Sequence, residues 1–348
     1  MSPYLAAVHD LMLQGLENRL FTGAVLLVDW RRETVFHQAY GTVGSPEDPP
    51  VTLDTLFDLA SLTKVLVTTP CWMIEVGRSP QSLDRPLREW LPEAPVDKAG
   101  LTPRLLLAHC SGLPAWRPYY LFPSTRDCLQ LVRDRILHEH LAYKPATHTI
   151  YSDLGFMVLA ALLEESWGMN LALAAKKRVF EPLGLADHLM FQPDPTRDAI
   201  CFTRPGDQPG AVHDLNARAL NGISGHAGLF GTAYGVWGIA RDILQSLQSA
   251  DGLFTASVAA MFCRRAGIVP GSFRALGFEK PDGDVSSCGR YFSPESIGHT
   301  GFTGTSLWID PTRSLIVVLL TNRVYMGETD MRIKEFRPLL HDTVVQSL

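Results

Sequence analysis

The first forty residues alternate apolar and polar positions in two different ways. Residues 4–19 place apolar side chains three or four positions apart, which predicts an amphipathic helix. Residues 23–29 and 33–40 are short runs rich in β-branched and aromatic residues, which is typical of strands. Only Trp30-Arg31-Arg32 separates the two runs, so we expect a β-hairpin.

Strand-like runs return only near the other end of the chain. Residues 305–310 and 315–321 flank a Pro-Thr-Arg-Ser turn and predict a second hairpin. Residues 331–345 then show helical spacing and predict a terminal helix.

The middle of the chain has helical spacing interrupted by loops that contain Gly and Pro. The expected helices span residues 104–108, 125–138, 154–167 and 171–180. Strands at both ends and helices between them indicate an α+β fold, with one antiparallel sheet built from both chain ends and flanked by helices. We expect a sheet domain of residues 1–70 and 235–348 and an inserted, mostly helical domain of residues 71–234.

One further helix is expected to begin at Ser61 and to reach about Val76, with Gly77 as its C-cap. Pro70 lies inside this span. Because proline lacks a backbone N–H, it predicts a kink or a break there.

Composition excludes several classes of protein. The chain has 348 residues, of which 46% are hydrophobic and 19% charged, and its net charge is −5. It has no basic excess for binding nucleic acid or anchoring to a membrane, and no apolar run of the roughly 20 residues that a membrane span needs. The N-terminus does not resemble a secretory signal, so we expect a cytoplasmic protein, although a signal already removed would leave the same sequence.

The six cysteines are dispersed and form no C-x-x-C pair, so we expect reduced thiols and no metal site. His138-Glu-His140 does not have the H-E-x-x-H spacing of a zinc-binding helix. We expect no cofactor, and a small molecule or short peptide as substrate.

Candidate chemistry begins with Ser61-x-x-Lys64. A serine and a lysine three positions apart lie on one face of a helix, and a helix start offers unpaired N–H groups to a developing negative charge. The tetrapeptide alone is common. Two other stretches add to it: Tyr151-Ser152-Asp153 directly before an apolar helix, and His299-Thr300-Gly301 directly before the second hairpin.

These three motifs, in this order, resemble those of the serine β-lactamase and penicillin-binding-protein family, most closely its class C-like branch of esterases, D-aminopeptidases and DD-carboxypeptidases. Supporting matches are residues 105–114, 212–214 and 225–230. The resemblance covers nearly the whole chain. It implies a β-lactamase/DD-peptidase-like fold with the active site where the two domains meet.

The resemblance implies that Ser61 is the nucleophile and that Lys64 and Tyr151 move its proton. Both groups ordinarily titrate near pH 10, so burial or a neighbouring charge must change at least one pKa. They form a coupled pair, and the sequence leaves open which of them is the base. The backbone N–H groups of Ser61 and Phe302 would form the oxyanion hole. Thr300 and Gly301 would bind substrate.

Two positions depart from the family pattern, and both concern the substrate. The family often has Lys where this chain has His299, and often has Asn where it has Asp153. A neutral histidine and a carboxylate would favour neutral esters or substrates with a free amine over anionic penicillins. Alternatively, Asp153 pairs with Lys64 and holds it in place.

Other polar stretches have weaker interpretations. We expect His109 and Ser111 to lie in a structural turn and His213-Asp214 to fix a loop. His226, Ala227, Trp116 and Tyr119 are candidates for the pocket rim.

The expected function is that of a serine hydrolase acting through a Ser61 acyl-enzyme, on an ester or a D-amino-acid amide or peptide rather than chiefly on β-lactams. The alternative is a non-catalytic or slowly deacylating penicillin-binding or sensing module with the same fold.

Overall fold

A five-stranded antiparallel sheet forms the centre of the molecule. The computed structural model describes residues 5–122, 127–197, 199–249, 251–283 and 286–348. The strand order is β2-β1-β8-β7-β6. The strands are β1 (Gly23–Trp30), β2 (Glu33–Gly41), β6 (Ile297–Thr300), β7 (Ser306–Asp310) and β8 (Leu315–Thr321). Strands from both chain ends therefore share one sheet, as predicted, and the fold is α+β.

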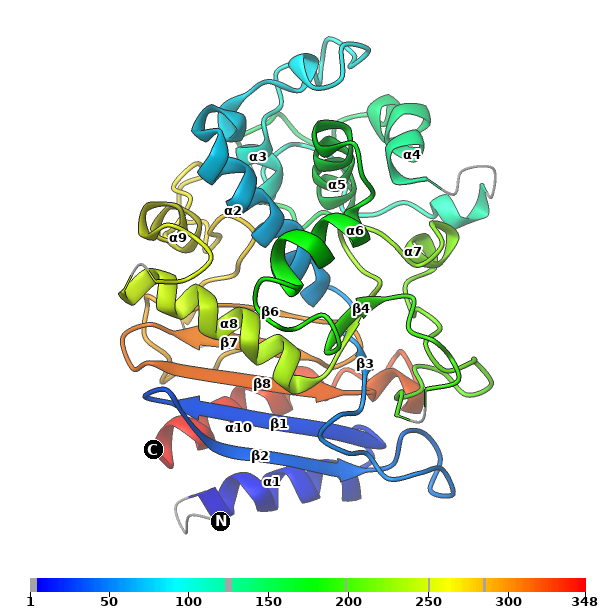
Figure 1. Cartoon of the computed structure of the whole chain (residues 1–348), viewed down its shortest axis with the longest axis vertical. Coiled ribbons are helices and arrows are strands. Elements are labelled where there is room, and N and C mark those ends of the chain that lie inside the picture. Colours follow the sequence, from blue (N-terminus) through cyan, green and yellow to red (C-terminus); the bar gives the residue numbers. More distant parts are fainter. Residues whose placement is uncertain (1–4, 123–126, 198, 250, 284–285) are drawn as a thin grey trace.

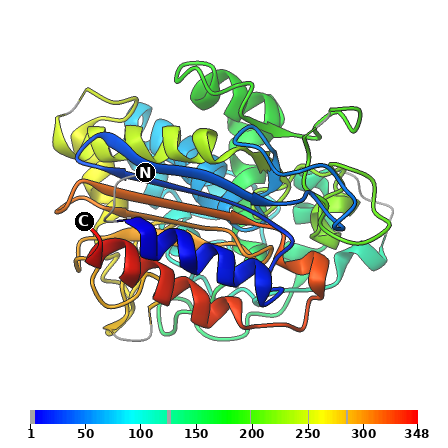
Figure 2. The same ribbon diagram turned by 90° about the horizontal axis from the view of Figure 1, so that it is seen from below.

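Helices cover both faces of this sheet. Helices α1 (Ala6–Glu17) and α10 (Ile333–Gln346) lie side by side on one face, and Figure 2 shows them in blue and red. Helix α8 (Ala233–Gln248) packs on the other face (Figure 1). Because both faces are covered, every residue of β8 is buried. Both predicted hairpins and both predicted terminal helices are confirmed.

The remaining helices lie above α8 in Figure 1. They are α2 (Thr69–Arg78), α3 (Pro103–Leu107), α4 (Cys128–Asp134), α5 (Asp153–Trp167), α6 (Leu171–Ala175), α7 (Leu215–Ala219) and α9 (Ala256–Cys263). Short 3-10 turns are Pro80–Asp84, Leu87–Glu89, Tyr119–Leu121, Ile136–His138 and Arg323–Met326. Residues 154–163 of helix α5 are apolar on all sides of the helix. All ten are buried among the other helices, as expected for a helix without a polar face.

Helices were expected at 104–108, 154–167 and 171–180, and all three are found, although the last ends as a π-helical turn, η7 (Lys176–Phe180). The expected helix 125–138 begins outside the described residues; its described part is α4, which is interrupted at Arg135 before a short 3-10 turn. Of the described helices, none is by itself long and apolar enough to span a membrane, and only α5 together with residues 171–180, bent by 74°, meets that test as a pair.

The helix expected from Ser61 continues through Pro70 instead of breaking there. A π-helical turn, η2 (Lys64–Thr68), precedes α2, and the Thr69 N–H donates to Lys64 O, one residue further back than in an α-helix. This wider turn accommodates Pro70 near the start of α2. The expected C-cap at Gly77 is wrong, because the Ser79 N–H still donates to Glu75 O and the helix ends at Arg78.

A second sheet, which the sequence did not predict, joins the segment before Ser61 to two segments that come much later in the chain. It has three short strands in the order β3-β5-β4: β3 (Phe57–Asp58), β5 (Leu229–Gly231) and β4 (Leu189–Phe191). Strand β3 directly precedes Ser61, so this sheet supports the start of that helix. The division into domains at residues 70 and 235 remains a prediction.

Candidate active site

The backbone before Ser61 is held in an unusual conformation. Ala60 has φ of +46°, in the left-handed region that costs a residue with a Cβ about 1–2 kcal/mol. The buried carboxylate of Asp58 stabilises it by accepting the Ala60 N–H at 2.8 Å and the His213 N–H at 2.7 Å. Burial raises the pKa of Asp58 to about 6, although both N–H donors oppose this shift. The strained turn places Ser61 directly before the first residue of the helix.

Lys64 lies beneath Ser61 and is completely buried. Its ammonium Nζ donates to Ser61 Oγ at 3.1 Å and to the carbonyl oxygen of His226 at 3.0 Å. It also forms an ion pair with Asp153 Oδ1 at 2.8 Å. The structure therefore has the pairing of Asp153 with Lys64 that the sequence left as one of two alternatives.

Tyr151 completes this group. Its half-buried ring lies 4.8 Å from Lys64 Nζ, and its buried hydroxyl makes no hydrogen bond of normal geometry to another described residue. Ser61 and Tyr151 line the same cavity. The structure thus brings together the three predicted catalytic side chains, which lie up to ninety residues apart in the chain.

The charges around Lys64 keep both candidate bases protonated. Burial lowers the pKa of Lys64, but Asp153 and Tyr151 raise it, and the net direction is upward. Burial raises the pKa of Tyr151; Lys64 lowers it, Asp153 raises it, and the net direction is again upward. The resting site therefore contains an ammonium, a neutral phenol and a carboxylate.

The ring of His109 supports Tyr151 from behind. His109 is buried, with its ring centroid 4.7 Å from that of Tyr151 and 5.1 Å from that of Phe156. Its Nδ1 accepts the Ser152 N–H at 3.1 Å. Burial lowers the pKa of His109 well below its usual value, so the ring is neutral. The structural turn expected at His109 is present, and it also orients the Tyr151 segment.

His299 lies in β6, one residue before the end of the strand. Its Nδ1 lies 2.8 Å from the Thr300 carbonyl oxygen, and since a carbonyl only accepts, Nδ1 carries the proton. Nε2 is then an acceptor, and it has no hydrogen-bond partner among the described residues. Burial lowers the pKa of His299 to about 4, although Glu279 opposes the shift. His299 is therefore neutral at pH 7, as predicted.

The backbone N–H groups of Ser61 and Phe302 are the predicted oxyanion donors. Ser61 and Phe302 each line both of the cavities that adjoin the site. Within the described part of the chain, neither of their backbone N–H groups donates a hydrogen bond to another residue. Both donors are thus open to a substrate oxygen.

Two cavities meet at Ser61, with volumes of about 500 Å³ and about 420 Å³. Ser61, Tyr151 and Phe302 line both of them. The first cavity is also lined by Trp116, Tyr120, Asp153, Arg204, His213, Asp214, His226, Ala227 and Glu328. The second is also lined by Arg274, Glu279, His299, Thr300, Gly301, Arg323, Lys334 and Arg337. A reacting bond at Ser61 would have room on either side.

Three of the four residues expected at the pocket rim line the first cavity. Trp116, His226 and Ala227 line the first cavity. Tyr119 does not: its ring is buried and its hydroxyl donates to Glu139 Oε1 at 3.0 Å, because the short 3-10 turn at 119–121 directs it inward. Tyr120 lines the cavity instead.

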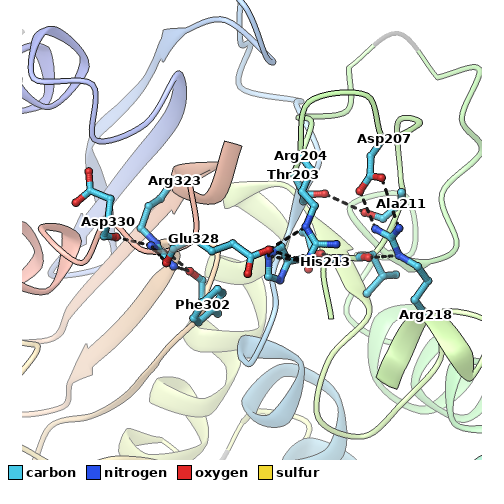
Figure 3. A network of polar contacts seen from close by, with 12 residues as sticks. Thr203, Arg204, Asp207, Ala211, His213, Arg218, Phe302, Arg323, Glu328 and Asp330 are labelled. Carbon is cyan, nitrogen blue, oxygen red and sulfur yellow. Dashed lines mark hydrogen bonds and ion pairs between the residues drawn. The ribbon is translucent and has the colours of Figure 1, made fainter. Parts of the chain in front are cut away.

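A polar network forms the outer wall of the first cavity (Figure 3). Glu328 Oε1 accepts from Arg204 at 2.7 Å and lies 3.2 Å from His213 Nε2. The His213 ring packs on that of Phe302, with 5.2 Å between centroids. His213 thus fixes a loop, as expected, and also contributes to the cavity wall.

A second series of contacts joins Ser224, His226 and Asp214. It has the residue types of a catalytic triad, but its serine does not line the cavity. His226 lies 2.9 Å from Asp214 Oδ1 through Nε2 and 2.8 Å from Ser224 Oγ through Nδ1. Burial acts to raise the pKa of Asp214, but the interaction with His226 and the hydrogen bond from the Ala217 N–H act against it. The net pKa is lowered, so this carboxylate is ionised. Ser224 is buried and does not line the cavity, so the series is structural: it positions the His226 carbonyl that Lys64 contacts.

Sequence reasoning missed Asp58 and Arg337. Each is a charged residue within a buried apolar pattern: Asp58 lies in the run before Ser61, and Arg337 lies on the stripe of Ile333, Phe336 and Leu340 in α10. A charge on a buried face was the available signal. Within the described residues, no cluster of three or more His, Cys, Asp or Glu side chains could hold a metal, and all six cysteines are buried and free.

The fold and the arrangement of motifs define a hydrolase class of the β-lactamase and penicillin-binding-protein type. The chain belongs to the Beta-lactamase family, whose model matches residues 8–339. The fold and the family expected from the three motifs are both confirmed.

Among known proteins, an Escherichia coli O157:H7 protein named "Putative D-alanyl-D-alanine carboxypeptidase" is 28% identical over 357 residues, covering 89% of this chain and 80% of that protein. Among the solved structures that share the fold are the following two. One, named EstCE1, a hydrolase with promiscuous acyltransferase activity, has a TM-score of 0.76 at 22% identity and covers 96% of this chain and 98% of its own. The other, a class C beta-lactamase, has a TM-score of 0.77 at 18% identity, with coverages of 100% and 97%.

Proposed function

We propose that this chain is a serine hydrolase that forms an acyl-enzyme on Ser61 with a small ester, amide or β-lactam-like substrate, and that it prefers esters or D-amino-acid amides and peptides. The observation that carries the proposal is the 3.1 Å hydrogen bond from Lys64 Nζ to Ser61 Oγ, at the point where two cavities meet. A nucleophile next to a base and a cavity is the usual geometry of acyl transfer.

The reaction follows from the positions of the groups. The Lys64–Tyr151 pair first loses one proton, since both groups are protonated at rest. Ser61 Oγ then attacks the substrate carbonyl and passes its proton to this pair, while the N–H groups of Ser61 and Phe302 bind the oxyanion. The pair returns the proton to the leaving group, and water later attacks the acyl-enzyme in the same way.

The substrate preference rests on charge. His299 is neutral and offers only an acceptor, so it lacks the fixed cation that would attract a carboxylate. The relative named as a D-alanyl-D-alanine carboxypeptidase supports a peptide, and the neighbour named as a hydrolase with acyltransferase activity supports an ester.

A slowly deacylating penicillin-binding protein is the second candidate. Asp153 lies 2.8 Å from Lys64 Nζ and stabilises its protonated form. A protonated lysine cannot activate the water that releases the acyl group, so the acyl-enzyme would persist.

The test is intact-mass analysis after incubation with a fluorophosphonate and, separately, with a penicillin. We expect a fluorophosphonate adduct that Ser61→Ala abolishes, and a short-chain nitrophenyl ester hydrolysed faster than a cephalosporin. A penicillin adduct that does not decay would favour the second candidate. A folded protein that forms neither adduct would indicate a non-catalytic binding module, and an adduct that survives in Ser61→Ala would reject Ser61 as the nucleophile.

A further inference from the structure

Arg337 is a buried arginine beneath the loop that follows β6. It projects from α10 and is only 5% exposed. Within the described residues it has no carboxylate ion-pair partner. Its guanidinium instead donates to three backbone carbonyls, those of Gly301 at 2.6 Å, Thr305 at 2.8 Å and Gly304 at 3.2 Å.

Burying a guanidinium without a carboxylate is unfavourable for folding. Burial lowers the pKa of Arg337 and the nearby charge of Arg323 lowers it further, whereas the carboxylate of Glu279, which forms no ion pair with it, opposes the shift. Arginine nevertheless stays protonated at neutral pH, so the charge is retained and must be satisfied by hydrogen bonds. All three acceptors belong to one five-residue loop, which points to a role for the charge at that loop.

The carbonyl of Gly301 and the N–H of Phe302 belong to the same peptide group. Because a peptide group is planar, a donor that fixes its oxygen also fixes the direction of its N–H. A charged donor on the oxygen also polarises the group and makes the N–H a stronger donor. Arg337 thus acts, through one peptide, on the proposed oxyanion donor.

The loop leaves little space for another arrangement of this peptide. The Gly301 N–H donates to Thr305 O at 2.8 Å. A Cβ on Gly301 would lie 2.1 Å from Thr305 Oγ1 and 2.8 Å from the carbonyl oxygen of Leu59, two residues before Ser61. Gly301 therefore packs closely against the backbone that leads into Ser61.

Arg323 holds the next peptide of the loop. Its Nε and Nη2 donate to Phe302 O at 3.0 and 2.7 Å, as Figure 3 shows. That oxygen belongs to the peptide between Phe302 and Thr303, so Arg323 fixes the loop without acting on the Phe302 N–H itself.

We propose that Arg337 is a positioning residue of the oxyanion hole: its guanidinium fixes and polarises the Gly301–Phe302 peptide so that the Phe302 N–H is directed at the oxyanion formed when Ser61 attacks. This inference rests on the proposed function of Ser61 as an acylated nucleophile.

The test compares hydrolysis of an oxoester with that of the matching thionoester, because sulfur accepts hydrogen bonds from an oxyanion hole more weakly than oxygen. In Arg337→Met we expect kcat for the oxoester to fall roughly tenfold to a hundredfold, with KM little changed. The thionoester rate should fall much less, so that the oxo-to-thiono ratio decreases. Arg332→Met removes an exposed arginine at the start of the same helix, which pairs with Asp330 and donates to the Asn18 carbonyl oxygen but does not contact the loop at 301–305, and should keep the wild-type ratio.

Arg337→Lys keeps the charge with shorter reach and should give an intermediate ratio, which provides a readout if Arg337→Met does not fold. Arg337 also lines two cavities, so added methylguanidinium should partly restore the oxoester rate of Arg337→Ala. A folded Arg337→Met or Arg337→Lys variant with the wild-type ratio would overturn the inference. Full activity in Ser61→Ala would instead overturn the proposed function, so the two failures are distinguishable.

Discussion

Asp153 and Tyr151 lie beside the buried Lys64 and next to Ser61, and the charges of this group affect the protonation of the site. Asp153 raises the pKa of both other groups. It therefore stabilises a resting state in which Lys64 is charged and Tyr151 is neutral. Whichever of the two is the base, the carboxylate opposes the loss of the proton that starts the reaction.

Asp153→Asn should move the pH dependence of acylation to lower pH. Without the carboxylate, the pKa values of Lys64 and Tyr151 both decrease, so the pair loses its activating proton earlier as pH rises. The measurement is kcat/KM for an activated ester against pH. Asp153→Glu, which keeps the charge, is the control and should leave the rising limb in place. An unchanged limb in Asp153→Asn would show that Asp153 does not control the protonation of the pair.

His299→Lys should change substrate selection. A cation at this position would attract a substrate carboxylate, whereas neutral His299 does not. We expect the rate of acylation by a penicillin, relative to that by a neutral ester, to increase roughly tenfold, which corresponds to about 1.4 kcal/mol. His299→Gln, which stays neutral, should not increase this ratio. An equal increase in both variants would exclude charge as the cause.

Among the elements, α5 connects the site with the core of the helical region. Its N-cap residue, Ser152, accepts the Gly155 N–H at 3.2 Å and lies between Tyr151 and Asp153. At its other end, Glu164 accepts the Leu171 N–H at 2.8 Å and so joins α5 to the start of α6. One rigid, buried helix thus positions two residues of the site.

Glu164 should make the stability of this helix pair depend on pH. Burial raises its pKa from 4.5 to about 7, although the Leu171 N–H opposes the shift. Because the folded state favours the protonated form, the stabilisation is complete below pH 4.5 and is lost as pH rises through about 7. Glu164→Gln stays neutral and still accepts the hydrogen bond. Urea denaturation should therefore show the variant gaining stability over wild type from pH 5 to pH 8; a constant difference would contradict this.

At the scale of the whole molecule, one sheet joins the two ends of the chain. Strand β1 pairs with β8, with Leu26 opposite Leu319. The helix that starts after Ser61 follows the first hairpin in the chain. The loop at 301–305, which contains the expected oxyanion donor Phe302, lies between β6 and β7. The pairing of β1 with β8 therefore brings the proposed nucleophile close to the loop that is expected to bind its oxyanion.

Leu26→Ala should test how strongly this pairing supports the molecule. Leu26 is completely buried in the core between the sheet and the helices α1 and α10. A truncation there should decrease the free energy of unfolding by about 2–5 kcal/mol, because it leaves a cavity. Leu13→Ala is the matched control: Leu13, in α1, is 39% exposed, and its loss should cost no more than about 0.5 kcal/mol. Equal effects in chemical denaturation would mean that Leu26 does not lie in a packed core.

Much of this architecture was predictable because local patterns reflect local physics. The hairpins at 23–40 and 305–321 follow from runs of apolar residues around short turns, and the apolar run of α5 predicts a buried helix. The continuation of the helix through Pro70 was not predictable, since it depends on a π-helical turn that local rules do not specify. Nor was the three-stranded sheet, whose strands are only two or three residues long.

The sequence by itself determined the composition of the candidate site: Ser61, Lys64, Tyr151 and the loop at 299–302 were identified from their motifs and order. Only the tertiary structure decided their electrostatics. The sequence left open whether Asp153 pairs with Lys64, and the structure has this ion pair at 2.8 Å while Asp153 also lines the first cavity. Arg337 is thirty-six residues from Gly301, and its contact with that carbonyl follows from the packing of α10 on the sheet. Charge interactions depend on distance and burial, which are properties of the folded chain.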